Sequence, residues 1–205
     1  MPRPLVPLIS IDALVTAALE LVDEAGDFSL PKLAKRIGVS QSSIYNHVSG
    51  REEILELMRG RIIGESPYTI EEGQDWESAL RSIVRSYRDA FARHPRLAPL
   101  MVLQTVQHPQ VLALYENLAV ALESAGFRGQ DVVSAISTID SFALGFALDL
   151  AAPDVVWAPP PQGYPALTQA LTHAGPPERR GSAAFDFGLE ILVAGIRARL
   201  QPSVV

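Results

Sequence analysis

The chain has 205 residues, contains no cysteine and carries a formal net charge of −6 at neutral pH. Its length is enough for one medium-sized domain or two small ones, and its hydrophobic share of 48% is ample for a buried core. The lack of cysteine excludes a disulfide framework, thiolate catalysis and a cysteine-ligated metal site.

The amino-terminal segment is not expected to direct the chain into or across a membrane. Its apolar run is short and is broken by Pro2, Pro4 and Pro7, unlike the continuous stretch of a signal peptide. No window of the chain reaches the uninterrupted apolar length that a membrane span needs. We therefore expect a cytoplasmic protein that makes no membrane contact.

Three short helices are predicted near the amino terminus, and they share one small core. The first covers about 11–25, and apolar residues keep helical spacing again over 30–37. Gly38 suits the end of this second helix, because only glycine enters the left-handed conformation without a steric cost. Ser40 can then cap a third helix, whose apolar residues point inward. The segment 29–48 therefore reads as a helix-turn-helix.

The outward face of the third helix carries amides, hydroxyls and aromatic rings but no carboxylate. Such a face suits the major groove of DNA. The four charged residues from Phe28 to Arg51 are all cationic, so this segment is +4 in a chain of net −6. The alternative is a solvated surface helix in an ordinary helical hairpin, since a lone helix-turn-helix pattern has false positives. The outward residues are Gln41, Ser42, Ser43, Tyr45, Asn46 and His47.

Residues from about Asp12 to Ile62 resemble the DNA-binding domain of the TetR (tetracycline repressor) family of bacterial regulators. Two positions depart from the family's pattern: Asn46 stands where an aromatic residue is usual, and Ser42 where proline, alanine or glycine is frequent. These departures bear on the preferred base sequence and not on the fold. The segments that carry the resemblance are Ala25-Gly26, 29–34, 37–40, 44–48 and 51–55.

Chemistry and the resemblance together assign roles to the polar residues of this region. Ser29 is expected to cap the second helix and can also touch the DNA backbone, and Ser42 belongs to the same surface. The candidates for contacts to base edges, which amides and hydroxyls can read, are Gln41, Ser43 and Asn46. The candidates for contacts to phosphate, which position the protein without specifying sequence, are Lys32, Tyr45, His47 and Arg51.

The predicted organisation is all-α, with a three-helix DNA-reading domain over 1–48 and a connecting helix over 49–65. A capping box between Ser49 and Glu52 opens the connecting helix. Residues 66–205 form a larger helical domain for effector binding and dimerisation. Its predicted helices cover about 76–91, 97–103 with an interruption at Pro99, 109–125, 132–152, 166–173 and 182–200, with a proline-rich loop over 153–165.

Two of these helices carry small residues along one face and large apolar residues along the other. Small residues allow close approach, so such helices can pack on two neighbours at once. We expect a homodimer held by a four-helix bundle of helices 130–152 and 182–200 from each subunit, which the resemblance also implies. The alternative is that both faces serve the core of one chain. The small residues are Ser134, Thr138, Ser141, Gly145, Ala184, Gly188 and Gly195.

The larger domain places polar and aromatic residues inside apolar helices, a composition typical of small-molecule sites. Any one of them is more often a core residue, so the prediction depends on the group and on the resembled family, whose larger domain commonly binds an effector. The apolar surroundings indicate a largely hydrophobic ligand, and neither a cofactor nor a metal is expected. The candidate lining residues are Trp76, Tyr87, Gln104, Tyr115, Phe142 and Phe146.

The sequence contains no Gly-x-Ser-x-Gly elbow, no His-Glu-x-x-His and no Gly-rich phosphate loop. We therefore expect no enzyme but a DNA-binding transcriptional regulator of a palindromic operator, released by a small-molecule effector. Repression of transcription is commoner than activation in the resembled family, and activation is the alternative. A second alternative is a helical ligand-binding or protein-interaction module that does not read DNA. The charge of the first 65 residues favours this alternative slightly, because 7 basic and 9 acidic side chains make the segment net negative.

Overall fold

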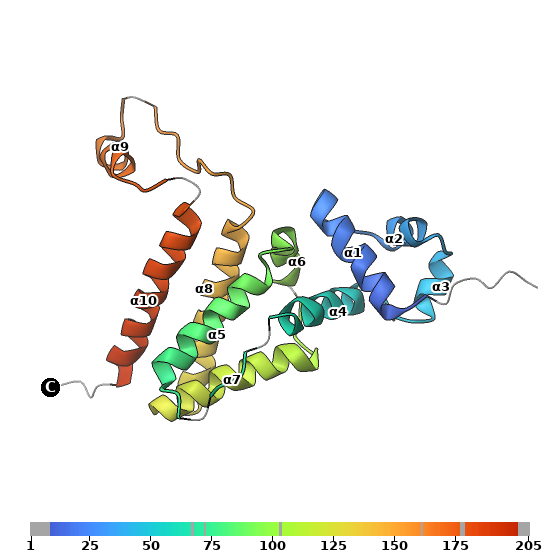
Figure 1. Cartoon of the computed structure of the whole chain (residues 1–205), viewed down its shortest axis with the longest axis horizontal. Coiled ribbons are helices and arrows are strands. Elements are labelled where there is room, and N and C mark those ends of the chain that lie inside the picture. The colour runs from blue at the N-terminus through green and yellow to red at the C-terminus, as the bar shows by residue number, and fades with distance from the viewer. Residues whose placement is uncertain are drawn as a thin grey trace, which may run out of the picture.

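The computed structural model describes residues 9–66, 68–71, 73–102, 104–160, 162–176 and 179–200. Within these ranges the chain is helical and has no strand, which confirms the predicted all-α class (Figure 1). Residues 1–8 and 201–205 of the predicted domains lie outside the described residues. The helices are α1 (Ile11–Ala25), α2 (Leu30–Ile37), α3 (Gln41–Tyr45), α4 (Arg51–Gly64), α5 (Trp76–Ala90), η1 (Pro95–Leu97), α6 (Ala98–Met101), α7 (Pro109–Ala125), α8 (Gln130–Asp149), α9 (Pro165–Thr172) and α10 (Arg180–Leu200).

Helices α1, α2 and α3 form a head at one end of the molecule, and α4 runs from it into a body made by the later helices (Figure 1). Each helix of the head starts at a serine hydroxyl, which accepts a hydrogen bond from a backbone N–H in the first turn. The caps are Ser10, Ser29 and Ser40, at 3.0, 3.4 and 3.2 Å. Gly26 and Gly38 end α1 and α2 in the left-handed conformation, which confirms the prediction made for Gly38.

The predicted capping box of the connecting helix is wrong by one residue. Helix α4 begins at Arg51, so its cap is Gly50, which has no side chain to offer. Glu53 reaches back in place of Glu52, and its Oε2 accepts from the backbone N and the hydroxyl of Ser49 at 2.6 and 2.7 Å. These two donors lower the pKa of the Glu53 carboxyl.

The body is built around α5, α7 and α8, which pack against one another, while α10 packs on α8 and α5. Ion pairs join α10 to α5: Arg81 donates to both carboxylate oxygens of Glu190 at 2.9 Å, and Arg85 pairs with Asp186. The expected interruption at Pro99 is wrong, because the proline lies in the first turn of α6, where a helix tolerates a missing N–H. No residue of α9 is buried, and this helix projects from the body (Figure 1).

In the described part of the chain, α8 alone is long and apolar enough to cross a membrane by length and composition. The stretch is not uninterrupted, because Ser134, Ser137, Thr138, Asp140 and Ser141 stand among its apolar residues. Core helices of globular proteins share this length and composition when they are mostly buried. Helix α8 packs against α5, α7 and α10, and 22% of its apolar window is buried. It also carries Asp131 and Asp140, which a lipid environment would disfavour.

Helices α8 and α10 pack against each other at an aromatic cluster of Phe142, Phe146 and Phe185. A Cβ atom placed on Gly188 would lie only 2.7 Å from Cε2 of Phe142. Gly188 therefore faces the neighbouring helix of its own chain, where its small size allows the close approach that was predicted for the small residues. Gly145, by contrast, would hold a Cβ with no atom within 4 Å.

Replacing Gly188 with alanine is expected to lower the free energy of unfolding by about 1–2 kcal/mol. Overpacking a core costs about 1–3 kcal/mol, and the higher helix propensity of alanine returns at most about 1 kcal/mol. The matched control Gly145→Ala has no clash and should gain about 0.5–1 kcal/mol. Denaturant titration measures both values. Equal stabilisation by the two substitutions would contradict the close approach.

Candidate functional site

The third helix of the head presents a polar surface to solvent. Its aromatic residue, Tyr45, is 51% exposed, and the face contains no acidic residue. The fully exposed positions are Gln41, Ser42, Tyr45 and Asn46, and the half-buried ones are Ser43 and His47. This surface holds every predicted DNA-contacting residue of the segment 41–47, although Asn46 and His47 follow Tyr45, the last residue of α3.

A network of hydroxyls holds the first turn of this helix. The Oγ of Ser40 lies 2.8 Å from the Oγ of Ser42 and 2.7 Å from that of Ser43, in addition to capping the Ser43 N–H. A hydroxyl has one donor and two acceptor sites, so Ser40, with three partners, is fully engaged, whereas Ser42 and Ser43 keep capacity for a further partner. Ser29 plays the corresponding capping role on α2, next to the exposed Lys32.

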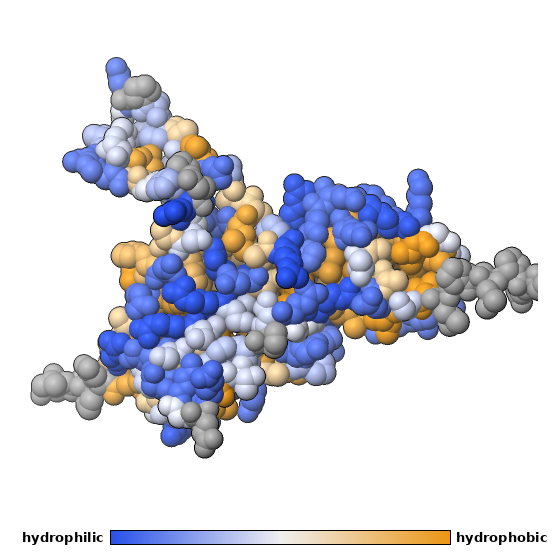
Figure 2. Space-filling model, in the orientation of Figure 1, coloured by the Kyte–Doolittle hydropathy of each residue, from blue (hydrophilic) through white to orange (hydrophobic). Residues whose placement is uncertain are grey.

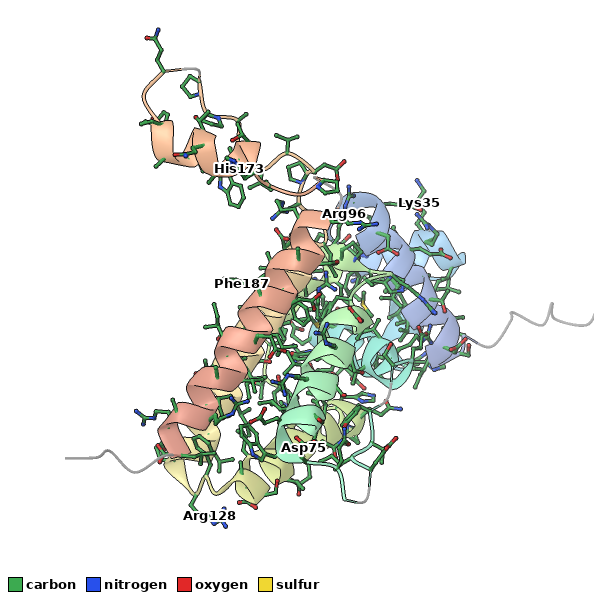
Figure 3. All side chains as sticks on the ribbon, turned by 60° about the vertical axis from the view of Figure 1, so that its left-hand side comes forward. Lys35, Asp75, Arg96, Arg128, His173 and Phe187 are labelled. Atoms are coloured by element: carbon green, nitrogen blue, oxygen red, sulfur yellow. The ribbon has the colours of Figure 1, made fainter. Side chains whose placement is uncertain are left out.

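Acidic residues of α1 and of the turn after it neutralise half of the positive charge predicted for 28–51. Arg36 pairs with Glu24 of α1, and Arg51 pairs with Asp27 at 2.6 Å. The positive surface next to α3 is therefore smaller than the sequence count implied. In the described ranges, the two cations of this segment without an ion pair are Lys32 and Lys35, and Lys35 points outward in Figure 3.

Arg51 braces the turn between α1 and α2. Besides its ion pair with Asp27, its Nε donates to the carbonyl of Phe28 at 3.4 Å, and its guanidinium lies 5.1 Å from the centre of the Phe28 ring. The guanidinium lowers the pKa of the Asp27 carboxyl. A DNA phosphate that binds Arg51 would therefore share the Arg51 guanidinium with Asp27.

Arg59, which sequence reasoning missed, joins α4 to the body. This side chain is 3% exposed, and its Nη2 and Nε donate to the carbonyl and the sulfur of Met101 at 2.8 and 3.1 Å. Its Nη1 pairs with Glu56 at 3.2 Å, and the other oxygen of Glu56 accepts from the backbone N–H groups of Gln107 and His108. The sequence signal that could have revealed this residue is a cationic side chain within the apolar stripe of a predicted helix.

A second contact joins the head directly to the body. The Nδ1 atom of His94 lies 2.7 Å from the carboxylate of Asp23 near the end of α1. Arg96 of η1 donates to the carbonyls of Asp23 and Glu24 at 3.0 and 2.9 Å (Figure 3). The last carbonyls of α1 are thus satisfied by a side chain of the body.

The body contains a partly open cavity of about 380 Å³, the central cavity, whose lining comes from α4, α5, α7, α8 and the segment 101–106 and includes the exposed Val102 and Leu148. Tyr87 and Tyr115 donate their hydroxyls to the same oxygen, Oδ1 of Asp140, at 2.8 and 2.6 Å. Burial raises the pKa of both phenols, so both stay protonated. The polar lining residues are Arg59, Tyr87, Gln104, Tyr115, Asp140 and Ser141, and the apolar ones include Met101, Val102, Val106, Leu144 and Leu148.

The cavity brings together three of the six residues predicted to line an effector site: Tyr87, Gln104 and Tyr115. The other three lie elsewhere. Trp76 begins α5 and packs half-buried against the core. Phe142 and Phe146 belong to the aromatic cluster between α8 and α10.

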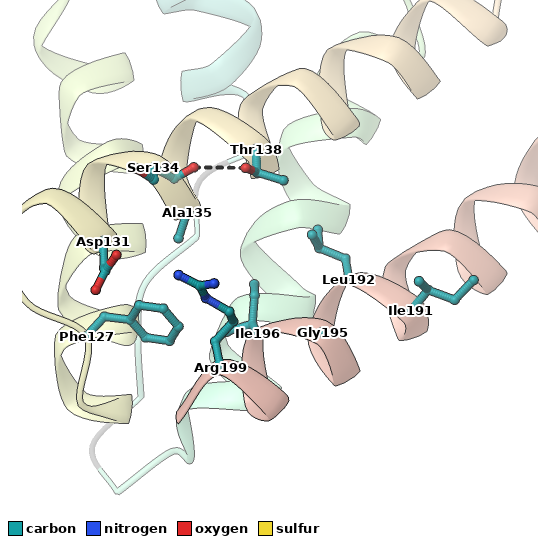
Figure 4. A pocket seen from close by; sticks show the side chains of 10 residues that line it. All are labelled: Phe127, Asp131, Ser134, Ala135, Thr138, Ile191, Leu192, Gly195, Ile196 and Arg199. Carbon is teal, nitrogen blue, oxygen red and sulfur yellow. Dashed lines mark hydrogen bonds between the residues drawn. The ribbon is translucent and has the colours of Figure 1, made fainter. Parts of the chain in front are cut away.

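An open apolar groove of about 440 Å³ lies between α8 and α10 (Figure 4). Ser134, Thr138 and Gly195, three of the predicted small residues, line it. Beside the groove, Ile191 is 57% exposed and Phe187 is 71% exposed and points away from the bundle (Figure 3). Hydrophobic surface is visible along this edge of the molecule in Figure 2.

The described residues contain no group of three or more histidine, aspartate or glutamate side chains placed to hold a metal ion.

The chain is similar to known regulators along almost its whole length. A family model described as "Tetracyclin repressor-like, C-terminal domain" matches residues 69–200. The tetracycline repressor protein class D of Escherichia coli is 30% identical, over 92% of this chain and 89% of that protein. The structure of apo ActR from Streptomyces coelicolor covers 94% of this chain and 97% of its own, with 24% identity and a TM-score of 0.77. BioQ with its double-stranded DNA operator covers 93% of this chain and 99% of its own, with 23% identity and a TM-score of 0.69.

Proposed function

The chain belongs to the tetracycline repressor (TetR) family, and from this we propose that α3 reads the major groove of a palindromic operator. Like its relatives, the protein is a DNA-binding transcriptional regulator, and the family's usual action is repression that a small-molecule effector relieves. The observation that carries the proposal is the exposed, acid-free face of α3 beside Lys32 and Lys35. The relatives are regulators and not enzymes, and we propose that this protein acts on DNA in the cytoplasm.

Contacts to DNA divide by the chemistry and exposure of each side chain. Gln41 and Asn46 are exposed amides that can pair with base edges, and the hydroxyl of Ser43 can join them. Tyr45 and Lys32 are exposed and suited to phosphate. The supporting phosphate contacts come from Ser29, Ser42, His47 and, while still paired with Asp27, Arg51.

The groove between α8 and α10 is proposed to close against a second copy of the chain. Phe187 and Ile191 expose large apolar side chains beside it, and exposed apolar patches mark interaction surfaces. Two helices from each subunit make a four-helix bundle. A two-fold dimer then presents two copies of α3, as a palindromic operator requires.

The effector is proposed to bind in the central cavity. Arg59 of α4 and Met101 of α6 line the cavity and are joined by a hydrogen bond. A ligand in the cavity would therefore contact α4, the helix that carries the head. A ligand that prefers one arrangement of α4 shifts the population toward that arrangement. Operator affinity changes when the two heads no longer match successive major grooves.

Selection from a random pool of duplexes tests DNA reading. We expect the wild-type protein to enrich a palindromic site and Tyr45→Ala to enrich it weakly, because one phosphate contact is lost in each half-site. The matched control is Tyr164→Ala, since Tyr164 is 55% exposed at the start of α9, outside the head. Failure of the wild type to enrich any site, even at low salt where phosphate contacts are strongest, would favour a helical module that does not read DNA.

A further inference from the structure

We propose that the central cavity binds an organic cation with an apolar body, and that Asp140 is the residue that selects the cation. This inference rests on the proposed function, because it names the chemical class of the effector for the same cavity. It also refines the expected hydrophobic ligand by adding a charged group.

The part of the cavity wall formed by Asp140 and the two tyrosines offers acceptors, while the other polar lining residues, Arg59, Gln104 and Ser141, carry donors. The hydroxyl groups of Tyr87 and Tyr115 both donate their hydrogen bonds to Oδ1 of Asp140. Their oxygens therefore face a ligand as acceptors. In the described part of the chain, no side chain donates to the other carboxylate oxygen, Oδ2. A ligand with a positively polarised end matches these acceptors, and one whose polar end only accepts hydrogen bonds does not.

The neighbouring arginine does not neutralise Asp140. Each of the three guanidinium nitrogens of Arg59 is already engaged, two by Met101 and one by Glu56. The charges of Arg59 and Glu56 cancel each other. The carboxylate of Asp140 therefore gives the cavity a net negative charge. A partly desolvated carboxylate gains from an opposite charge within a few ångströms, which favours a cationic ligand over a neutral one.

The remaining lining matches the rest of such a ligand. Val102, Val106, Leu144 and Leu148 provide apolar surface for a hydrocarbon body. The phenol rings of the two tyrosines add a second attraction, since a cation near an aromatic face interacts with the ring quadrupole. The volume of about 380 Å³ is in the range of small-molecule sites.

Three amphiphiles that share an octyl chain separate charge from apolar burial. The probes are octyltrimethylammonium, the near-isosteric octyldimethylamine N-oxide, which has no net charge at mildly alkaline pH, and octanesulfonate. Isothermal titration calorimetry on the full chain without DNA is expected to show the ammonium binding about tenfold or more tightly than the N-oxide. The sulfonate is expected to bind most weakly.

Asp140→Asn tests the assigned residue, because the amide oxygen still accepts from both tyrosines while the charge is lost. We expect this substitution to weaken ammonium binding about tenfold and not to weaken N-oxide binding, whose oxygen can accept from the new amide N–H. The matched control Glu116→Gln removes one charge from an exposed position that does not line the cavity, and it should change neither. Tyr115→Phe keeps the charge and should retain the preference for the cation.

Equal binding of ammonium and N-oxide by the wild type, tighter binding of the sulfonate, or binding of none of the three would overturn the cation class without reference to any variant. An unchanged preference in Asp140→Asn would overturn the role of Asp140. A parallel operator-binding assay distinguishes these failures from failure of the proposed function, because a protein that binds no operator can still show or lack the cation preference.

Discussion

Replacing Arg59 with alanine is expected to lower the free energy of unfolding by about 3–5 kcal/mol, the usual cost of removing one partner of a buried ion pair. Arg59 is 3% exposed, and its partner Glu56 has a side chain that is 15% exposed. The substitution leaves the Glu56 carboxylate without its cation and the Met101 carbonyl without its donor. Denaturant titration of wild type and variant measures the difference.

A matched surface pair provides the control for this result. Arg93 pairs with Glu65 at 3.3 Å, but the two side chains are 79% and 44% exposed. Arg93→Ala should therefore cost no more than about 1 kcal/mol. The double variant Arg59→Met/Glu56→Gln should recover part of the lost stability, since it leaves no unpaired charge. If Arg59→Ala costs no more than Arg93→Ala, the pair does not join α4 to the body as described.

Replacing Asn46 with alanine is expected to reduce operator affinity by about 1–3 kcal/mol for each half-site, and so by about 2–6 kcal/mol for a dimer on a palindrome. An exposed amide at the end of α3 can pair with adenine through two hydrogen bonds. The loss of affinity should appear on the selected operator. It should be much smaller on duplexes in which the base pair read by Asn46 is changed in both half-sites. Dissociation constants at fixed salt for both duplexes measure it.

Lys32→Ala gives the contrasting pattern. Its exposed cation should contact phosphate, so its loss should weaken binding to all sequences alike and reduce the salt slope by about one unit per half-site. Asn46→Ala should leave the salt slope unchanged. A uniform loss across sequences in Asn46→Ala would place Asn46 on the DNA backbone and remove it from base reading.

Much of the head could be predicted because its determinants are local in the chain. The serine caps Ser10, Ser29 and Ser40 act on N–H groups three residues away, and Gly26 and Gly38 end helices through their own backbone conformation. Such interactions depend on residue type and spacing alone. The capping box failed by one residue, because helix boundaries depend on where the preceding turn places the chain.

Other features were decided by packing between distant segments. The sequence count of four cations near α3 did not reveal that Arg36 and Arg51 meet Glu24 and Asp27. The acids belong to another helix and to the turn after it, and only the folded head brings them within bonding distance.

Helical periodicity shows which residues of a helix point inward but does not show which neighbour they meet. For that reason the sequence by itself determined the all-α class, the helix-turn-helix and its outward polar face. Only the tertiary structure placed Phe142 in an aromatic cluster while it gathered Tyr87, Tyr115, Asp140 and Arg59 around one cavity. These four residues come from four helices, and a cavity between helices exists only once their axes have packed.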